Sequence, residues 1–219
     1  MPALARPGKV ICAGANYYKH LAEMGVSYVK DAARPPFLFL KPATALEGPL
    51  VLDPTIHMLD WEVELVAVIG RGGRKLAVAH ALDHVAGYSV AVDVTARDRL
   101  MQPESIFKFD FLSGKGRDGY CPIAPAFVPA AALGDPQAAK LRLAVNGAVK
   151  QDASTGDMIY SVAELIAWAS QLMTLEPGDL LLTGSPEGVG FPRREFLRVG
   201  DVMTVELVGH LSFTSEVVG

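Results

Sequence analysis

Short runs of β-branched and other apolar residues recur along the chain, separated by turns rich in Gly and Pro. The sequence has 21 Gly and 15 Pro among 219 residues. Runs of this length, bounded by turn formers, are typical of β-strands. The predicted strands are 10–13, 37–40, 61–69, 85–95, 141–145, 180–183, 202–208 and 211–218. Strands should therefore dominate the fold.

Two local signals add detail. Asn146-Gly147 follows the predicted strand 141–145 and suits the positive φ angles of a type I′ hairpin turn. In SVAELIAWASQLM, Ser161 and Glu164 form a capping box that predicts a helix start. The apolar face expected for this helix consists of Leu165, Trp168, Ala169 and Leu172. With so few helices and no strict strand-helix alternation, we predict a β-rich α+β fold forming one domain over residues 1–219.

The composition excludes several classes of partner. The net charge is -4, and no block of Lys and Arg predicts a nucleic-acid or anionic membrane surface. The start of the chain lacks the apolar stretch of a signal peptide, and no apolar run reaches the roughly 18 residues that span a bilayer. We therefore expect a cytoplasmic, soluble protein. Its two cysteines, Cys12 and Cys121, have no metal-ligand spacing and should fill core space.

Carboxylates interrupt one apolar segment, LDWEVELVAVIG at 59–70. Asp60, Glu62 and Glu64 occupy every second position, so on a strand they share one face. The alternation also fits the solvent-facing side of a half-buried strand. If the face is dry, the carboxylates repel and need a positive partner, either a divalent cation or an Arg or Lys side chain.

A further carboxylate lies in a second apolar segment, GYSVAVDVTARD. Asp93 interrupts this strand-like run, and Arg97 and Asp98 follow where the strand should end. Asp93 could form an ion pair with a nearby base. Together with Glu62 and Glu64, however, it gives three carboxylates from two strands, which is the oxygen-rich donor set that Mg²⁺ prefers. The pattern favours an open metal site.

Several ordered motifs resemble the fumarylacetoacetate hydrolase family, specifically its small single-domain members. These members include acylpyruvate hydrolases, oxaloacetate decarboxylases and diene-dioate isomerases. The resemblance runs nearly end to end. Its motifs are GANYYKHLAE, DWEVELVAVIG, GYSVAVDVTARD, GKGRDGYCPIAP, VNGAVKQDASTGDMIYS and LMTLEPGDLLLTGSPEGVG. It implies a mixed β-sheet roll or sandwich with few short helices.

The resemblance also implies roles for individual residues. The metal ligands would be Glu62, Glu64 and Asp93, holding Mg²⁺, with Mn²⁺ and Ca²⁺ as alternatives. His20 and Glu23 would form a catalytic dyad on a short helix, and Lys115 would be the catalytic lysine. The implied substrate-binding residues are Arg97, Asp118, Thr155, Thr183, Gly184 and Ser185. The chain departs from the family pattern at Leu100, where many members have Gln.

The activity implied is hydrolysis of a carbon-carbon bond in an acylpyruvate-like or fumarylacetoacetate-like 1,3-dicarbonyl, through a metal-stabilised enolate. The same enolate serves an isomerase or a decarboxylase, which need no attacking water, so both remain alternatives. A non-catalytic metal or small-molecule binding protein is a third. The expected partners are a small 2-oxo acid substrate and a second copy of the chain in a homodimer.

Overall fold

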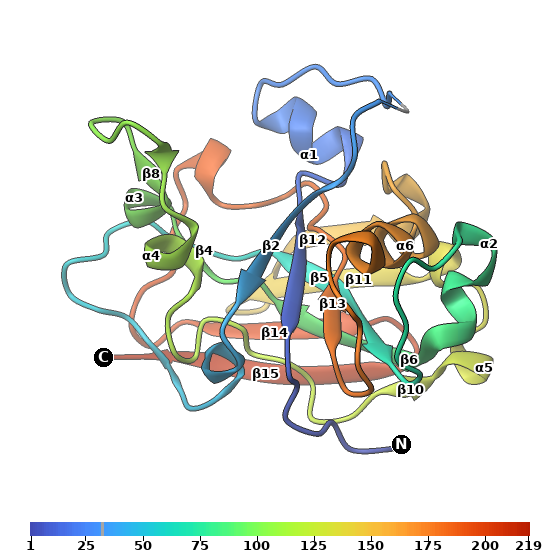
Figure 1. Cartoon of the computed structure of the whole chain (residues 1–219). Helices are drawn as coiled ribbons and strands as arrows, with labels where there is room; N and C mark the ends of the chain where they lie inside the picture. Colours follow the sequence, from blue (N-terminus) through green and yellow to red (C-terminus); the bar gives the residue numbers. More distant parts are fainter. Residues whose placement is uncertain (32) are drawn as a thin grey trace.

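The computed structural model describes residues 1–31 and 33–219. Strands form two large sheets and two small two-stranded ones (Figure 1). The strands are β1 (Val10–Gly14), β2 (Phe37–Lys41), β3 (Leu50–Val51), β4 (Leu59–Asp60), β5 (Val63–Ile69), β6 (Val85–Val92), β7 (Thr95–Ala96), β8 (Met101–Gln102), β9 (Lys108–Phe109), β10 (Val128–Pro129), β11 (Lys140–Val145), β12 (Ala148–Ser154), β13 (Leu180–Leu182), β14 (Val202–Leu207) and β15 (Leu211–Val218).

The helices are short and lie around the sheets. The α-helices are α1 (Tyr18–Glu23), α2 (Val78–Ala81), α3 (Arg97–Leu100), α4 (Phe111–Lys115), α5 (Ala130–Leu133) and α6 (Val162–Leu172), and the 3-10 helices are Ala43–Leu46, Leu82–His84, Pro136–Ala138, Thr155–Asp157 and Phe191–Arg193. Within the described ranges, no helix has the length and apolar character needed to cross a bilayer. The β-rich α+β prediction is confirmed.

The larger sheet has six strands in the order β10-β6-β5-β13-β1-β2. Only β1 and β13 pair in parallel, and their neighbours are antiparallel. Every residue of β5 is buried, so both faces of this strand are shielded from solvent. Leu65 and Ala67 point to one face, and Val66 and Val68 to the other.

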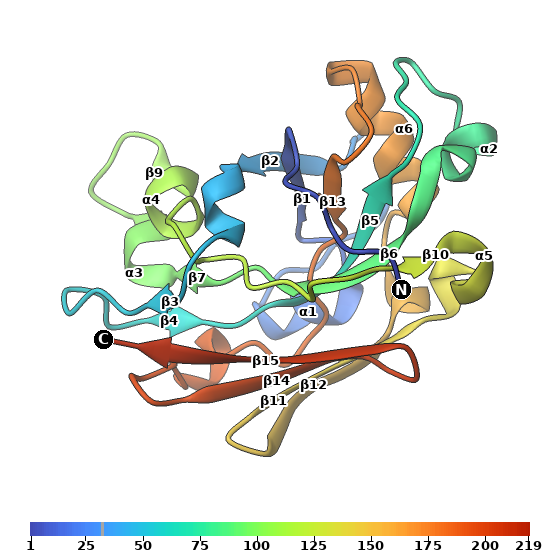
Figure 2. The ribbon, with the colours of Figure 1, turned by 90° about the horizontal axis from the view of Figure 1, so that it is seen from below.

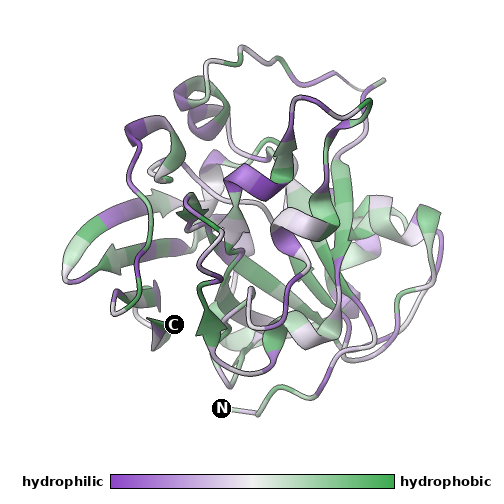
Figure 3. Cartoon of the chain, turned by 90° about the vertical axis from the view of Figure 1, so that its left-hand side faces the viewer, coloured by the Kyte–Doolittle hydropathy of each residue, from purple (hydrophilic) through white to green (hydrophobic). Residues whose placement is uncertain are grey.

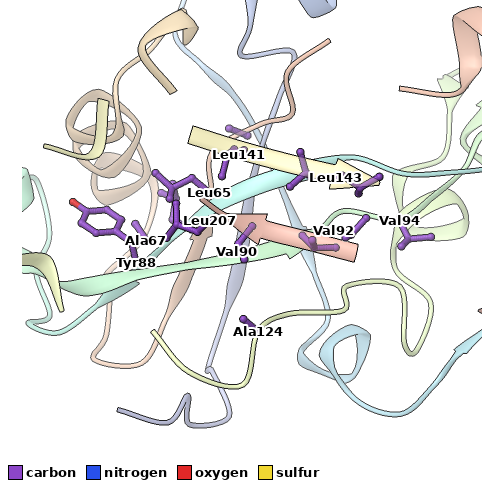
Figure 4. Close-up of a cluster of buried hydrophobic side chains, with 14 of the residues drawn as sticks. Leu65, Ala67, Tyr88, Val90, Val92, Val94, Ala124, Leu141, Leu143 and Leu207 are labelled. Carbon is purple, nitrogen blue, oxygen red and sulfur yellow. The ribbon is translucent and has the colours of Figure 1, made fainter. Parts of the chain in front are cut away.

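The second sheet has five strands in the order β12-β11-β14-β15-β3. It lies below the six-stranded sheet, as Figure 2 shows. Leu141, Leu143 and Leu207 of this sheet share a hydrophobic core with Leu65 and Val90 of the other (Figure 4). Figure 3 shows the hydrophobic residues concentrated on the central strands. The two sheets therefore pack face to face, and the even-numbered side chains of β5 point away from this shared core.

The local predictions hold, except for the helix face. Every predicted strand is present, but the strand predicted at 61–69 begins only at Val63, and the strand predicted at 85–95 is interrupted after Val92. Asn146 and Gly147 have φ angles of 50° and 80°, as a type I′ turn requires. Ser161 and Glu164 form the predicted capping box of α6. The buried face of α6 is Val162, Leu165, Ile166, Ala167, Ala169 and Ser170.

The prediction for Leu172 was wrong, since this last residue of α6 is 52% exposed, and Trp168 is only half buried. The reason is Ser170. Its hydroxyl accepts a hydrogen bond from the backbone N–H of Leu76 and donates one to the carbonyl of Ala167. A serine whose hydroxyl has both hydrogen bonds satisfied can face the core. The buried face of the helix therefore includes Ser170 and is rotated away from Trp168 and Leu172.

Candidate functional site

Strand pairing brings the three predicted metal ligands together. Glu62 immediately precedes β5, Glu64 lies in it, and Asp93 immediately follows β6. The register pairs Val63 with Val92, and the N–H of Asp93 donates to the carbonyl of Glu62 over 2.8 Å. One oxygen from each carboxylate lies within 4.8 Å of the other two. These buried carboxylates point to the face of β5 that is turned away from the five-stranded sheet.

Arg97 and Lys115 neutralise part of this charge. The guanidinium of Arg97 donates to Asp60 over 2.9 Å and to Glu62 over 2.5 Å. The ammonium of Lys115, at the end of α4, donates to Glu62 and Asp93, both over 2.6 Å. Burial alone would raise the pKa of Glu62, but Lys115 and Arg97 hold it well below its ordinary value. Glu62 therefore stays ionised in a dry environment.

Lys115 is also fixed in its charged state. Burial by itself would lower the pKa of Lys115, but Asp93 and Glu62 outweigh it and hold the pKa above its ordinary value. Its ammonium makes a third hydrogen bond of 2.7 Å to the hydroxyl of Thr95. A protonated lysine with three acceptors is a fixed positive charge inside the cavity.

Lys41, at the end of β2, completes the ion network. Its buried ammonium lies 2.7 Å from Oδ1 of Asp93 and donates to the carbonyl of Tyr120 over 2.6 Å. The contact with Asp93 is an ion pair that lacks hydrogen-bond alignment, so among the described residues Oδ1 has no aligned donor. Sequence analysis missed Lys41. The signal was present in FLFLKP, where a lysine directly continues an apolar strand.

The residues fit a divalent cation. The network has four carboxylates, Asp60, Glu62, Glu64 and Asp93, against the three cations Lys41, Arg97 and Lys115. Glu64 is the carboxylate left over: in the described part of the chain no Lys, Arg or His lies within ion-pair distance of it, and its Oε2 accepts only the N–H of Gly184, over 2.7 Å. Burial raises the pKa of Glu64 well above its ordinary value, and Asp93 and Glu62 add to this. An all-oxygen set with excess negative charge suits Mg²⁺ or Mn²⁺.

His20 and Glu23 form the predicted pair on α1. Nδ1 of His20 lies 2.8 Å from Oε1 of Glu23, and His20 is 8% exposed. The other oxygen of Glu23 accepts the N–H of Gly188 over 2.9 Å. The carbonyl of Gly188 accepts the indole N–H of Trp61 over 3.0 Å. The dyad is thus connected to the strand that carries the acidic residues.

Gly188 can make both contacts because it has no side chain. Its φ is +100°, and a Cβ there would lie 2.2 Å from the carbonyl oxygen of Lys150. Only glycine combines this backbone conformation with so close an approach. The conformation of the loop at 183–190 therefore requires glycine at position 188.

Gln151 of β12 connects this loop to the acidic strand, and sequence analysis missed it too. Its Oε1 accepts the N–H of Val63 over 2.9 Å, and its Nε2 donates to Ser185 and to the carbonyl of Pro186, both over 2.9 Å. Gln151 belongs to the five-stranded sheet, so it joins the two sheets at the site. The sequence of β12, AVKQDAS, contains no pattern that distinguishes Gln151.

The predicted metal ligands line one cavity of about 270 Å³, together with His20, Lys115 and two of the predicted substrate-binding residues. Its lining includes His20, Glu62, Glu64, Asp93, Arg97, Lys115 and Ser185. A larger hollow of about 880 Å³, partly lined by Arg34 and Trp168, contains none of the predicted residues. The predicted catalytic and metal-binding residues therefore identify the smaller cavity as the candidate site.

Four predicted substrate-binding residues do not line this cavity, and neither does Glu23. Asp118 is exposed beyond α4. Thr155 is fully buried, and its hydroxyl donates to the carbonyl of Ala139. The hydroxyl of Thr183 donates to the carbonyl of Leu65, which holds the start of the loop on β5. Gly184 does not line the cavity either, and its N–H donates a hydrogen bond to Glu64.

Comparisons with known proteins identify the family of the chain. The family model described as fumarylacetoacetate (FAA) hydrolase C-terminal matches residues 9–218. The oxaloacetate tautomerase FAHD2A, mitochondrial, of Bos taurus is 42% identical over 209 residues, 93% of this chain. The matched region covers 64% of that relative, so the chain spans a little less than two thirds of its length.

Solved structures resemble the whole chain. A fumarylpyruvate hydrolase from Pseudomonas aeruginosa, in complex with Mn²⁺ and pyruvate, is 34% identical with a TM-score of 0.85, covering 97% of this chain and 90% of that one. A 2-hydroxyhepta-2,4-diene-1,7-dioate isomerase from Mycobacterium marinum is 36% identical with a TM-score of 0.80, covering 99% and 76%. The chain belongs to the fumarylacetoacetate hydrolase family.

Proposed function

We propose that the protein is a divalent-cation-dependent hydrolase that cleaves the carbon-carbon bond of an acylpyruvate, giving pyruvate and a carboxylic acid. One observation supports this most strongly: the carboxylates of Glu62, Glu64 and Asp93, the imidazole of His20 and the ammonium of Lys115 line a single cavity, and Glu23 is hydrogen-bonded to His20. Cleavage of a 1,3-dicarbonyl needs a general base, positive charge for an enolate and a means of orienting the 2-oxo acid. The cavity contains candidates for each.

Glu62, Glu64 and Asp93 would hold the cation, which we propose to be Mg²⁺ or Mn²⁺. The fumarylpyruvate hydrolase from Pseudomonas aeruginosa, which has the same fold, forms a complex with Mn²⁺ and pyruvate together. When bound, the cation would supply Lewis acidity to the carboxylate and 2-oxo oxygens of the substrate. The ion pairs of Arg97 with Glu62, and of Lys41 with Asp93, would keep the carboxylates in place.

His20 would act as the general base. Its Nδ1 is engaged by Glu23, which leaves Nε2 to take a proton from water. Glu23 would orient the ring and stabilise the imidazolium. The water oxygen adds to the carbonyl carbon distant from the carboxylate, and the bond from that carbon to the methylene breaks. The electron pair passes into the pyruvate part as an enolate.

Lys115 would stabilise the negative charge of the enolate as it develops. Its three hydrogen bonds fix the ammonium before the reaction begins, so no reorganisation is needed in the transition state. Placed charge of this kind is worth about 10²–10³ in rate. The enolate carbon then takes a proton to give pyruvate.

Tautomerisation or isomerisation of a related 2-oxo acid is the second candidate. The names of the Bos taurus and Mycobacterium marinum relatives favour it. Such reactions use the same enolate and the same positive charge but need no attacking water. Decarboxylation of oxaloacetate shares the enolate as well.

Separate assays with acetylpyruvate, oxaloacetate and 2-hydroxyhepta-2,4-diene-1,7-dioate test the proposal. We expect Mg²⁺- or Mn²⁺-dependent loss of acetylpyruvate, abolished by EDTA. The variant His20→Asn should lower hydrolysis about 10²–10⁴-fold, whereas His80→Asn, whose side chain is 74% exposed, should not. Activity on a diene-dioate or oxaloacetate alone would favour the second candidate, and silence on all three would refute both.

A homodimer is also part of the proposal. Ile106, Phe107, Phe109 and Leu112 are between 56% and 87% exposed. Apolar side chains gathered in one short segment often mark protein contacts. Sedimentation of the wild type against Ile106→Ser tests this, and a monomeric wild type would contradict it.

A further inference from the structure

The two walls of the cavity differ in chemistry. One wall carries the carboxylates and their cations. The other is built from β2, the α1 region and the α3–α4 segment, and it is apolar. This apolar wall consists of Leu21, Met24, Phe37, Phe39, Leu100 and Phe111.

The aromatic residues of the apolar wall pack as one unit. The ring centroids of Phe37 and Phe111 are 5.2 Å apart, and those of Phe39 and Phe111 are 5.1 Å apart. The ammonium of Lys115 lies 5.4 Å from the centroid of Phe39. The apolar wall therefore begins beside the ammonium of Lys115.

The cations at the cavity are already engaged. Arg97 is bonded to Asp60 and Glu62, and Lys115 to Glu62, Asp93 and Thr95. Among the lining residues that the structure describes, there is no other Lys or Arg, and the imidazole of His20 is paired with Glu23. A second carboxylate on the far end of a substrate would thus meet aromatic and aliphatic side chains instead of a counter-charge.

We infer that the cavity selects 2-oxo acid substrates with an apolar, uncharged tail and discriminates against those with a distal carboxylate. This inference rests on the proposed function, in which the charged wall takes the 2-oxo acid end. An alkyl or aryl tail gains from burial against Phe37, Phe39 and Phe111. A carboxylate tail loses hydration without gaining a partner. The preferred acylpyruvate therefore carries an alkanoyl or aroyl group rather than a fumaryl group.

Binding of two matched ligands tests the inference without turnover. In 2-oxohexanoate the chain ends in a methyl group, and in 2-oxohexanedioate it ends in a carboxylate. We expect calorimetric titration in the presence of Mn²⁺ to give a Kd at least about tenfold lower for 2-oxohexanoate. Kinetics with pentanoylpyruvate and fumarylpyruvate should give the same order.

A charged variant and a matched control test whether the preference for an apolar tail arises from the apolar wall. Phe37→Arg places a cation in the apolar wall and should reduce the preference at least about tenfold. Leu40→Arg adds the same charge to the same strand, at a residue of similar exposure, 52% against 50% for Phe37, but outside the cavity lining. This control should keep the wild-type preference.

The outcomes separate this inference from the hydrolase proposal. If wild type binds the dioate as tightly as 2-oxohexanoate, binds neither, or if Phe37→Arg keeps the wild-type preference, the inference is wrong. If 2-oxohexanoate is preferred but no acylpyruvate is cleaved, the hydrolase proposal fails and the apolar selectivity stands.

Discussion

The two large sheets differ in whether their charged side chains are buried or exposed to solvent. In the six-stranded sheet, β5 is buried along its whole length, yet the carboxylates of Glu62 and Glu64 lie on it or beside it. In the five-stranded sheet, β14 alternates between buried and half-buried residues. There, charged groups such as Glu206 and Arg142 stay partly exposed.

The difference shows which charges belong to a site. A charge on the outer face of the five-stranded sheet is solvated and costs little, so its ion pairs contribute little. A charge inside the six-stranded sheet must be neutralised, and each one present requires a partner within hydrogen-bond reach. Buried carboxylates in excess of their cations are therefore the mark of the functional region.

The largest effect is expected for Lys41→Met. Removing the ammonium leaves Oδ1 of Asp93 and the carbonyl of Tyr120 without their buried partner. Breaking a buried pair from one side costs about 3–5 kcal/mol, measured as the free energy of unfolding in urea. The control Lys140→Met, in the five-stranded sheet with a side chain 50% exposed, should cost at most about 1 kcal/mol. Equal losses in the two variants would remove the contrast between the sheets.

Glu64→Gln should separate function from stability. The variant keeps the shape of the side chain but removes the carboxylate that has no cationic partner. We expect Mn²⁺ affinity to fall at least about tenfold and turnover about 10²–10³-fold. Without metal, the variant should unfold at the same urea concentration as wild type or higher, since the cost of burying an ionisable carboxyl group is gone. The control Glu206→Gln should change neither quantity, and normal Mn²⁺ binding by Glu64→Gln would exclude Glu64 as a ligand.

Gln151→Ala examines the connection between the sheets. It removes the acceptor of the Val63 N–H and the donor to Ser185. A buried group left without a partner costs about 1–3 kcal/mol, and hydrogen exchange should show faster opening of loop 183–190. Gln171→Ala on the exposed side of α6 is the control. Unchanged exchange in the loop would mean that the connection is not needed.

The smallest effect is expected for Asp152→Asn in β12. A hydrogen bond from Lys140 lowers the pKa of Asp152, against a smaller opposing effect of burial. A carboxylate with a lowered pKa stabilises the folded state above its unfolded pKa, and this contribution is lost as pH falls through the folded value. Asp152→Asn should therefore cost at most about 1 kcal/mol at pH 7 and flatten the pH dependence of stability below about pH 4. A larger loss at neutral pH would show that this sheet also depends on charge.

Sequence analysis could identify the carboxylates because charged residues are unusual within apolar strands. Asp60, Glu62, Glu64 and Asp93 interrupt apolar strands, and the register that joins β5 and β6 follows from neighbouring strands in the chain. It did not identify Lys41, although this lysine continues an apolar strand, or Gln151, which occupies an ordinary strand position. Asp118, which a motif assigned to substrate binding, is exposed and lies outside the cavity lining.

The sequence by itself determined the strands, the Asn146-Gly147 hairpin, the capping box of α6 and the acidic strand, since each depends on residues a few positions apart. Only the tertiary structure decided which cations meet these carboxylates and what forms the opposite wall. Lys115 and Glu62 are 53 residues apart, and Gln151 and Val63 are 88 apart. No local pattern encodes such contacts, because they arise when two sheets and several loops pack around one cavity.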